Sequence, residues 1–536
     1  MRLVLSLLTL LISVSSFSQE TFPVNGTREK DVVYTAFTNA TIHMDHETVI
    51  ENGKMVIFKG KIFAVGADVV IPLNATIHDL DGKHIYPSFI DLDSDYGMPK
   101  VPESKWNRNP QMVSDKKGAF GWNESIKPEV RGADIFSHQN DKAKSLRAMG
   151  FGTVLSHQHD GIARGTSLLA GLGSSEHKNI IQPDVAAHYS FRKGSSSQQY
   201  PSSLMGSIAL LRQSHLDGMW YGSEANEDEA NLTLEAWNQS QSLPQIFEIR
   251  DKLSVLRADL IGDEFDVQYI FKTGCDSYQR LAEIKATNGA LILSLNYPAA
   301  YDVSDPYLTR MISLNEMKHW ELAPTDASRV AAEGIPFAIT SKGAGKDFMT
   351  NLRKAIKNGL SENDALKALT TTPAQLIGAD DQVGSLRNGY LASFIISEGN
   401  VFGEKNIIHE NWVQGERFVL SSMDMPSLRG DYNFTIGDYV YSMKVKGKPG
   451  KHKASVEIIK ANEEGVMDTT QVSVGFKQNG HLLTLTFNPK DGKIDGLARM
   501  AGNVNAESRI WDGQGQMPDG RWFDWVAVRQ GEPESD

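Results

Sequence analysis

The sequence predicts an α/β fold with all-β segments on both sides, and three patterns along its 536 residues indicate this arrangement. Between residues 83 and 382, short apolar runs alternate with helical patterns, which is typical of a parallel sheet covered by helices. Residues 32–82 read as strands and turns without a helical pattern. From residue 428 to 530 strand patterns return, with a hairpin turn at Asn479-Gly480, and predict a small all-β domain.

Several apolar runs in the central segment have the length and composition of buried parallel strands. They lie at residues 153–155, 246–249, 267–271, 291–295 and 336–340. Helical patterns separate them, for example over residues 143–149 and 278–286. This alternation supplies most of the eight strand–helix units that a (β/α)8 TIM barrel needs.

The first strand of the central segment carries a row of acids. An apolar run from Ile85, broken by Pro87, predicts a short buried strand that delivers Asp91, Asp93 and Asp95 at its C-terminal end. A spacing of two places all three side chains on one face of an extended strand. In a parallel α/β barrel, the chemistry takes place at this end of the strands.

This strand resembles the signature of the amidohydrolase superfamily, the urease-related metal-dependent hydrolases. There the first barrel strand reads P-G-x-I-D-x-H-x-H, and its two histidines hold a divalent metal. Three residues of that frame match, namely Pro87, Ile90 and Asp91. Ser88 replaces the usual glycine, and Asp93 and Asp95 stand at the two histidine positions.

Segments on both sides of the barrel carry the same resemblance. Residues 32–82 contain an N-A-T strand, a G-K-I hairpin and a D-x-x-G-K turn in the order of the family. Residues 384–389 resemble its later G-S-L-x-x-G. The resemblance implies a TIM barrel at residues 83–382, beside a composite β-sandwich built from residues 32–82 and 383–425.

The exit from the barrel resembles the helix pair that follows the last barrel strand in the superfamily. Ser361 has the position of an N-cap before an amphipathic helix. Pro373 is expected at the first position of a second helix, which Gly378 ends. The pattern indicates the family and not a particular reaction.

The N-terminus predicts export. Arg2, an apolar run over residues 3–14 and a serine-rich stretch fit a secretory signal peptide at residues 1–18, cleaved after Ser18. The run is too short to span a bilayer, and a buried N-terminal helix is the alternative. We therefore expect a periplasmic or secreted protein without a membrane anchor. The net charge of −12 argues against a nucleic-acid partner.

Cys275 is the only cysteine, so the chain forms no intrachain disulfide and no thiolate zinc site. Ser156 and Ser167 lack the G-x-S-x-G frame of a serine hydrolase. The glycine-rich stretch at residues 164–173 lacks the frame of a nucleotide loop and predicts a tight turn. Trp522 and Trp525 fit either the core of the C-terminal domain or a glycan-binding platform.

The resemblance also implies where metal ligands would stand. The family uses two histidines after the first strand, one after each of the fifth and sixth strands, and an aspartate after the eighth. In this chain the corresponding residues are Asp93, Asp95, Glu248, Lys272 and Lys342. An ammonium group cannot ligate a metal and repels one. The substitutions imply a degenerate site for which no metal cofactor is expected.

Without a metal, the carboxylates at the barrel mouth need other cations. We expect Lys272 and Lys342 to stand in for the metals by forming salt bridges with Asp93, Asp95 and Glu248. The alternative is that both lysines point into solvent.

His157-Gln158-His159 follows a later strand and offers a displaced centre. With Asp93 and Asp95 nearby, two imidazoles on one face would hold zinc or another divalent metal. The alternative is a pair of hydrogen-bonded histidines at the surface.

These patterns leave three interpretations of function. The first is a catalytically degenerate unit that supports, or presents substrate to, an active amidohydrolase unit in trans or on a longer chain. This interpretation follows from a resemblance to the degenerate first unit of tandem exported bacterial amidohydrolases. The second is an active metal-dependent hydrolase of non-peptide C–N bonds with an atypical Asp/His centre. The third is a periplasmic ligand-binding module.

Overall fold

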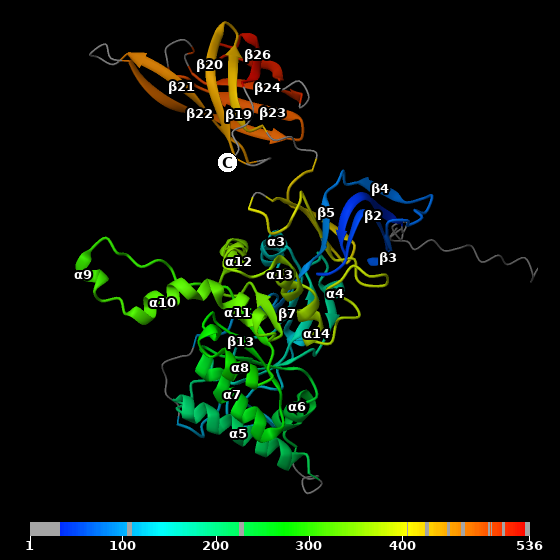
Figure 1. Cartoon of the computed structure of the whole chain (residues 1–536), viewed down its shortest axis with the longest axis vertical. Helices are drawn as coiled ribbons and strands as arrows, with labels where there is room; N and C mark the ends of the chain where they lie inside the picture. The colour runs from blue at the N-terminus through cyan, green and yellow to red at the C-terminus, as the bar shows by residue number, and fades with distance from the viewer. Residues whose placement is uncertain are drawn as a thin grey trace, which may run out of the picture.

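A computed structural model describes residues 33–530 of the chain, apart from several short internal segments. Those segments are residues 104–109, 224–229, 405, 424–427, 448–450, 462–466, 491–493, 495 and 506–509. The predicted signal peptide at residues 1–18, with its cleavage after Ser18, lies outside the described residues. Figure 1 shows three parts along the long axis, namely an α/β part, a sheet beside it and a C-terminal β-barrel.

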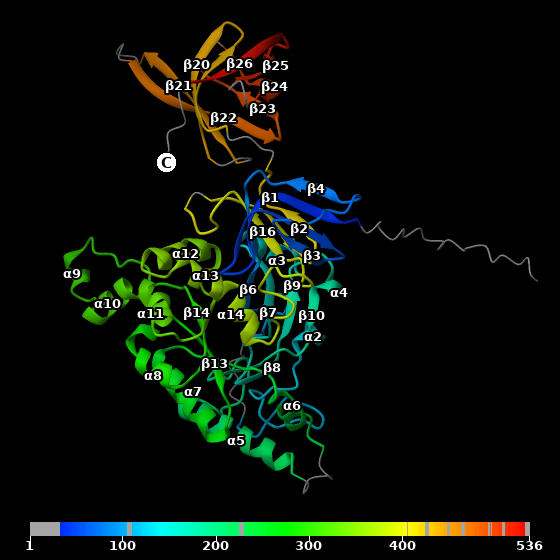
Figure 2. The same cartoon turned by 45° about the vertical axis from the view of Figure 1, so that its right-hand side comes forward.

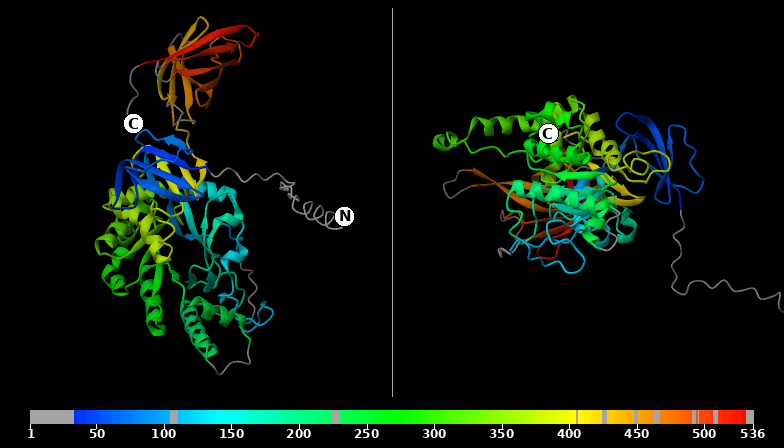
Figure 3. Two further views of the ribbon diagram at one scale, coloured as in Figure 1. Left: turned by 90° about the vertical axis from the view of Figure 1, so that its right-hand side faces the viewer. Right: turned by 90° about the horizontal axis from the view of Figure 1, so that it is seen from below.

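The sheet combines strands from both sides of the α/β part. Its N-terminal strands are β1 (Thr35–His43), β2 (Val49–Phe58), β3 (Lys61–Gly66), β4 (Thr76–Asp79) and β5 (His84–Pro87). Its later strands are β16 (Phe394–Ser397), β17 (Ile408–Val413) and β18 (Glu416–Val419). The order is β18-β17-β16-β5-β1-β2-β3, with β4 paired to β1. Because β16 runs antiparallel to β5, segments some three hundred residues apart share one sheet, as the blue and yellow ribbons of Figure 3 show.

The strands of the α/β part form two further sheets. One has the order β10-β9-β7-β6 and the other the order β15-β14-β13-β12-β11-β8. The first contains β6 (Phe89–Ser94), β7 (Phe151–Ser156), β9 (Leu168–Gly171) and β10 (Ile180–Gln182). The second contains β8 (Ala163–Thr166), β11 (Ala187–Ser190), β12 (Gln245–Glu248), β13 (Tyr269–Thr273), β14 (Leu291–Ser294) and β15 (Phe337–Thr340). All five predicted apolar runs are confirmed as strands, in β7 and in β12 to β15.

The pairing is parallel between β6 and β7 and throughout β11 to β15. It departs from an all-parallel arrangement at β8, which is antiparallel to β11, and at β9, which is antiparallel to β7. Figure 2 shows β6, β7, β9 and β10, the strands of the first of these two sheets, near one another. The chain reverses in this stretch with Gly161 and Gly165 at φ values of +107° and +80°. These left-handed conformations suit glycine, which has no Cβ.

Helices separate the strands. Before β12 they are α2 (Gly132–Ile135), α3 (Asn140–Ala148), α4 (Glu176–Asn179), α5 (Leu204–Tyr221) and α6 (Leu232–Ser240). After β12 they are α7 (Lys252–Phe265), α8 (Leu281–Ala286), α9 (Pro306–Thr309), α10 (Leu314–Leu322), α11 (Asp326–Ala332), α12 (Phe348–Lys357), α13 (Glu362–Leu369) and α14 (Thr371–Leu376). Short 3-10 turns lie at Ser277–Gln279, Ala323–Thr325 and Gly345–Asp347.

The predicted helix pair at the exit is present, with one correction. The Ser361 side chain accepts a hydrogen bond from the Asp364 amide and caps α13 as expected. Pro373 was expected at the first position of α14, but the helix begins at Thr371, so the proline is its third residue. A proline is tolerated there because the first-turn amides have no partner within the helix.

The C-terminal part is a closed barrel of eight antiparallel strands. They are β19 (Gly430–Ile436), β20 (Tyr439–Lys446), β21 (Lys453–Ala461), β22 (Met467–Asn479), β23 (Leu482–Phe487), β24 (Ala498–Asn505), β25 (Ile510–Gln516) and β26 (Trp522–Gln530). Trp511 and Trp525 are buried in its core, whereas Trp522 is exposed. The core interpretation is therefore confirmed for Trp525 and is wrong for Trp522, whose side chain points away from the packed interior.

The beginning and the end of the α/β part meet at one buried carboxyl. Asp91 in β6 accepts hydrogen bonds from the Thr340 hydroxyl at 2.6 Å, and from the Ser341 amide and hydroxyl at 3.0 and 2.6 Å. These bonds place the C-terminal ends of β6 and β15 side by side. None of the helices in the part of the chain that the structure describes has the length and hydropathy of a membrane-spanning segment.

Replacing Gly165 by alanine should destabilise the fold strongly. A Cβ at this position would overlap the backbone oxygen of Val130, and φ is +80°. We expect a loss of about 3 kcal/mol in the free energy of unfolding, from overpacking and the left-handed backbone together. Urea unfolding followed by tryptophan fluorescence measures it.

Gly334→Ala is the matched control, because Gly334 has a φ of +71° but nothing lies within 4 Å of the place that a Cβ would occupy. It should cost about 1 kcal/mol, the backbone contribution alone. Equal losses in the two variants would contradict the close approach to Val130.

Candidate functional site

A buried network of charges lies at the C-terminal ends of β6, β12 and β13. Asp93 comes from β6, Glu248 from β12 and Lys272 from β13. The Lys272 ammonium is 3.1 Å from Asp93 Oδ2 and 3.5 Å from Glu248 Oε1. Arg164 from β8 pairs with the other oxygen of Glu248. The parallel register between β12 and β13 pairs Glu248 with Lys272 directly, so the two side chains share one end of the sheet.

The pKa values in this network follow from its charges. Burial by itself would raise the pKa of Asp93, but Lys272 and then His159 hold it well below its ordinary value. Burial opposes the ionised form of Glu248 too, while Arg164 and Lys272 lower its pKa to about 2. Burial disfavours the charged form of Lys272, yet the two carboxylates raise its pKa. All three groups are therefore ionised at neutral pH, as two buried anions held by two cations.

Asp95 belongs to a separate, more exposed pair of contacts. Its Oδ1 is 2.6 Å from the Lys142 ammonium and 3.2 Å from that of Lys342. Burial alone would raise the pKa of Asp95, but these two lysines outweigh that effect and lower the pKa to about 2. The sequence predicted that Asp91, Asp93 and Asp95 share one face of the strand. Because β6 ends at Ser94, Asp95 leaves the strand alternation and meets different cations from Asp93.

The interpretation in which both lysines point into solvent is therefore wrong. The side chain of Lys272 is only 13% exposed and lies between two carboxylates. The side chain of Lys342 is 37% exposed, but it still contacts Asp95. The two lysines thus differ in depth, and only Lys272 is enclosed.

Three imidazole rings lie against one another beside the network. The His157 ring lies 3.6 Å from that of His188 and 3.9 Å from that of His159, between centroids. Burial lowers the pKa of His188 to about 3, and burial followed by the neighbouring His159 and His188 lowers that of His157 well below its usual range. Both rings are neutral in the folded protein at neutral pH. The interpretation as surface groups is wrong for His157, which is buried against His188 of β11, whereas the His159 side chain is 17% exposed and is hydrogen-bonded to Asp93.

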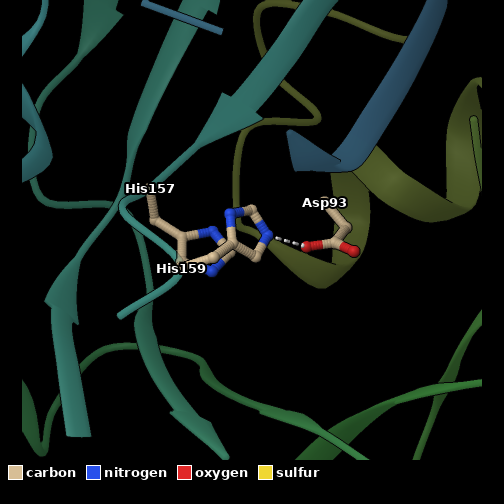
Figure 4. A group of neighbouring side chains, drawn as sticks. All are labelled: Asp93, His157 and His159. Carbon is tan, nitrogen blue, oxygen red and sulfur yellow. Dashed lines mark hydrogen bonds and ion pairs between the residues drawn. The ribbon is translucent and has the colours of Figure 1, made fainter. Parts of the chain in front are cut away.

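Asp93, His157 and His159 form a cluster of potential metal ligands. One ligand atom from each lies within 4.8 Å of the others. Figure 4 shows the two histidines reaching from one loop toward Asp93, with His159 Nε2 hydrogen-bonded to Asp93 Oδ1 at 2.7 Å. The Nδ1 atoms of both histidines are buried and have no hydrogen-bond partner among the described residues. Asp95, expected in this group, is not part of it.

The two sets of residues fit a divalent metal differently. The residues that the sequence resemblance assigns to the family's ligand positions include Lys272 and Lys342, whose ammonium groups do not fit a cation. The cluster of Asp93, His157 and His159 has suitable donor atoms. However, Asp93 already contacts Lys272, so a metal bound there would lie close to an ammonium group.

Sequence reasoning missed three residues of this site. Arg164 was assigned only to a tight turn, yet its guanidinium neutralises Glu248. Lys142 lies just before the helical pattern predicted over residues 143–149, and His188 lies between the predicted strands at residues 153–155 and 246–249, where the sequence predicted no element. For Arg164, the only local signal in the sequence is that a cationic residue directly precedes a glycine at which a turn is predicted. Nothing local marks Lys142 or His188, because their partners are distant in the sequence.

Comparison with solved structures supports the fold. An amidohydrolase from Thermotoga maritima MSB8 aligns with a TM-score of 0.57 and 20% identity, over 72% of this chain and 100% of that one. The model of the amidohydrolase family matches residues 325–421, which include β15, Lys342 and the exit helices. Residues 325–421 are thus similar to the amidohydrolase family, and the likeness in fold to the Thermotoga maritima protein extends over 72% of the chain.

Other amidohydrolase-like structures align at lower similarity. A putative prolidase from Bifidobacterium longum has 14% identity and a TM-score of 0.43, covering 72% of this chain and 95% of that one. A β-aspartyl dipeptidase from Fervidobacterium islandicum AW-1 has 16% identity and a TM-score of 0.42, covering 72% and 97%. No curated protein matches the chain significantly in sequence.

Removal of the buried ammonium should destabilise the protein. In Lys272→Met, Asp93 and Glu248 lose the cation between them while remaining buried, and we expect a loss of about 3 to 5 kcal/mol in unfolding free energy. Lys342→Met is the matched control at the exposed pair and should cost at most about 1 kcal/mol. Urea unfolding at pH 7 measures both. A smaller loss for Lys272→Met than for Lys342→Met would contradict the assignment of the buried network.

The difference between wild type and Lys272→Met should shrink on acidification. In the folded wild type the pKa of Glu248 is depressed to about 2, below its ordinary value of about 4.3. The ionised Glu248 therefore contributes its full stabilisation above about pH 4.3, and this contribution is lost as the pH falls through about 2. Without the ammonium, the carboxyls of the variant take up protons at higher pH and lose their buried charge. Unfolding free energies of both proteins at pH 7, 5 and 4 measure the difference. A difference in unfolding free energy that grows toward low pH would contradict this prediction.

Proposed function

We propose that this chain is a catalytically degenerate unit of the amidohydrolase superfamily. It would support, or present substrate to, an active amidohydrolase unit in trans or on a longer chain. The observation that carries the proposal is the position of the Lys272 ammonium, between Asp93 and Glu248 where the family's ligands would stand. A side chain of this chain supplies the positive charge that a metal supplies in the superfamily.

The charge balance of the network supports this proposal. Asp93 and Glu248 carry two negative charges, and Lys272 and Arg164 carry two positive ones. A divalent cation added beside them would leave an excess of buried positive charge, which is costly at low dielectric. Hydrolysis by a metal-activated water requires such a cation, and the family's final aspartate is replaced by Lys342.

We also propose that the two sheets of the α/β part are portions of one TIM barrel. Its strands would include β6, β7 and β11 to β15, with the hydrogen bonds of Asp91 joining β15 to β6. Export by a signal peptide at residues 1–18, to the periplasm or the medium, belongs to the same proposal.

A second candidate function is an active hydrolase with zinc or another divalent metal at Asp93, His157 and His159. The proximity of three ligand atoms and the unpartnered Nδ1 atoms favour it. When bound, such a metal would activate water for attack on a C–N bond. The chain would hold it with one carboxylate and two neutral imidazoles, which are ordinary ligands of zinc.

Elemental analysis of metal-saturated and dialysed protein separates the two functions. The degenerate unit should retain less than about 0.1 equivalent of zinc or manganese, because Lys272 already neutralises Asp93. One equivalent in the wild type, lost in both His157→Ala and Asp93→Asn but kept in His319→Ala, would overturn the proposal. Far-UV circular dichroism of each variant checks that it folds.

A further inference from the structure

We propose that a cleft at the C-terminal ends of β11 and β12 binds a small acidic ligand carrying two or more carboxylate or phosphate groups. We call it the arginine cleft, after Arg192, Arg250 and Arg257, which line it. Its volume of about 950 Å³ is that of a small-molecule site. The inference goes beyond the proposed function, because it holds whether or not the chain is catalytic.

The fold brings the cations of the cleft together from two neighbouring strands. Arg192 and Lys193 follow β11, while Arg250 follows β12 and Arg257 lies on α7. The strands β11 and β12 are parallel neighbours, so the residues after them meet at one edge of the sheet. The helices α5 and α7 both begin at the cleft, since its lining includes Leu204, the first residue of α5, and Asp251, the residue before α7.

The positive charge of the cleft is not neutralised by the protein. Within the described residues, the guanidinium groups of Arg192, Arg250 and Arg257 make no ion pair or hydrogen bond. Of the two carboxylates in the lining, Glu248 pairs with Arg164 and Lys272, and Asp251 caps α7 by accepting from the Ser254 amide but keeps its charge. One negative charge thus remains against the four cations of the lining, which are Arg192, Lys193, Arg250 and Arg257. The cleft therefore has a surplus of cations.

This surplus is unusual for the chain. With 66 acids and 54 lysines and arginines, carboxylates are in excess, and several arginines elsewhere pair with one. Pairs of this kind are Arg131 with Asp184, Arg212 with Glu264, Arg387 with Asp45 and Arg417 with Glu410. Three unpaired guanidinium groups in one concavity repel one another, and an anion bound between them removes that repulsion.

The chemistry of the lining selects the class of ligand. A guanidinium presents a planar fork of donors that matches the two oxygens of a carboxylate or phosphate. The first-turn amides of α5 and α7 add partial positive charge at the same cleft. Several cations at different places favour a ligand with two or more oxyanion groups over a single small anion.

The probe is the dipeptide Glu-Glu with both termini blocked, titrated by calorimetry into the full chain. Its matched control is the blocked Gln-Gln dipeptide, which has nearly the same size and no charge. We expect Glu-Glu to bind at least about tenfold more tightly than Gln-Gln, and more weakly as salt is added. Inorganic phosphate forms a separate arm, and tighter binding of phosphate than of Glu-Glu would identify the ligand class as phosphate.

The double variant Arg250→Gln/Arg257→Gln should lose about tenfold in affinity for each guanidinium removed. Arg310→Gln removes an exposed arginine elsewhere and should bind like the wild type. All these arginines are exposed, so melting temperatures should stay nearly unchanged. Equal binding of Glu-Glu and Gln-Gln, no binding of Glu-Glu or phosphate, or equal affinity in the double variant and Arg310→Gln would each overturn the inference.

Discussion

Burial of the Asp93 carboxylate imposes a requirement on everything around it. A side chain at this depth keeps its charge only beside a cation, because a lone buried anion is far too costly. In this chain Lys272 supplies that cation from a strand that lies far away in sequence. Lys272 is itself enclosed and needs Glu248, and Glu248 is held in turn by Arg164. The ends of β6, β8, β12 and β13 are therefore tied together by charge balance.

A second buried carboxyl on the same strand, that of Asp91, links β6 to the last strand of the α/β part. Asp91, two residues before Asp93, binds the hydroxyls of Thr340 and Ser341 and so joins β6 to β15. Burial raises the pKa of Asp91 despite these hydrogen bonds. Two carboxyls on one strand thus have different roles, since one is held by hydroxyl groups and the other by an ammonium.

The distribution of charge connects the proposed function with the arginine cleft. Glu248 lines that cleft and also contacts Lys272, so the buried network and the cleft are adjacent. The network is neutral overall, while the cleft has a surplus of cations. Under the proposed function, this adjacent surplus of cations is where the unit would hold an acidic molecule.

Local sequence patterns determined several strands of the fold and the acids at the end of one of them. Apolar runs of strand length located β7 and β12 to β15, and the frame around Pro87, Ile90 and Asp91 placed the acids at a strand end. Only the tertiary structure decided which cation each acid meets. His159 and Asp93 are 66 positions apart, and Arg164 and Glu248 are 84 apart. Periodicity reports which face of its own strand or helix a side chain takes, but a charge pair depends on how separate strands lie beside one another, and that is decided by the packing of the whole chain.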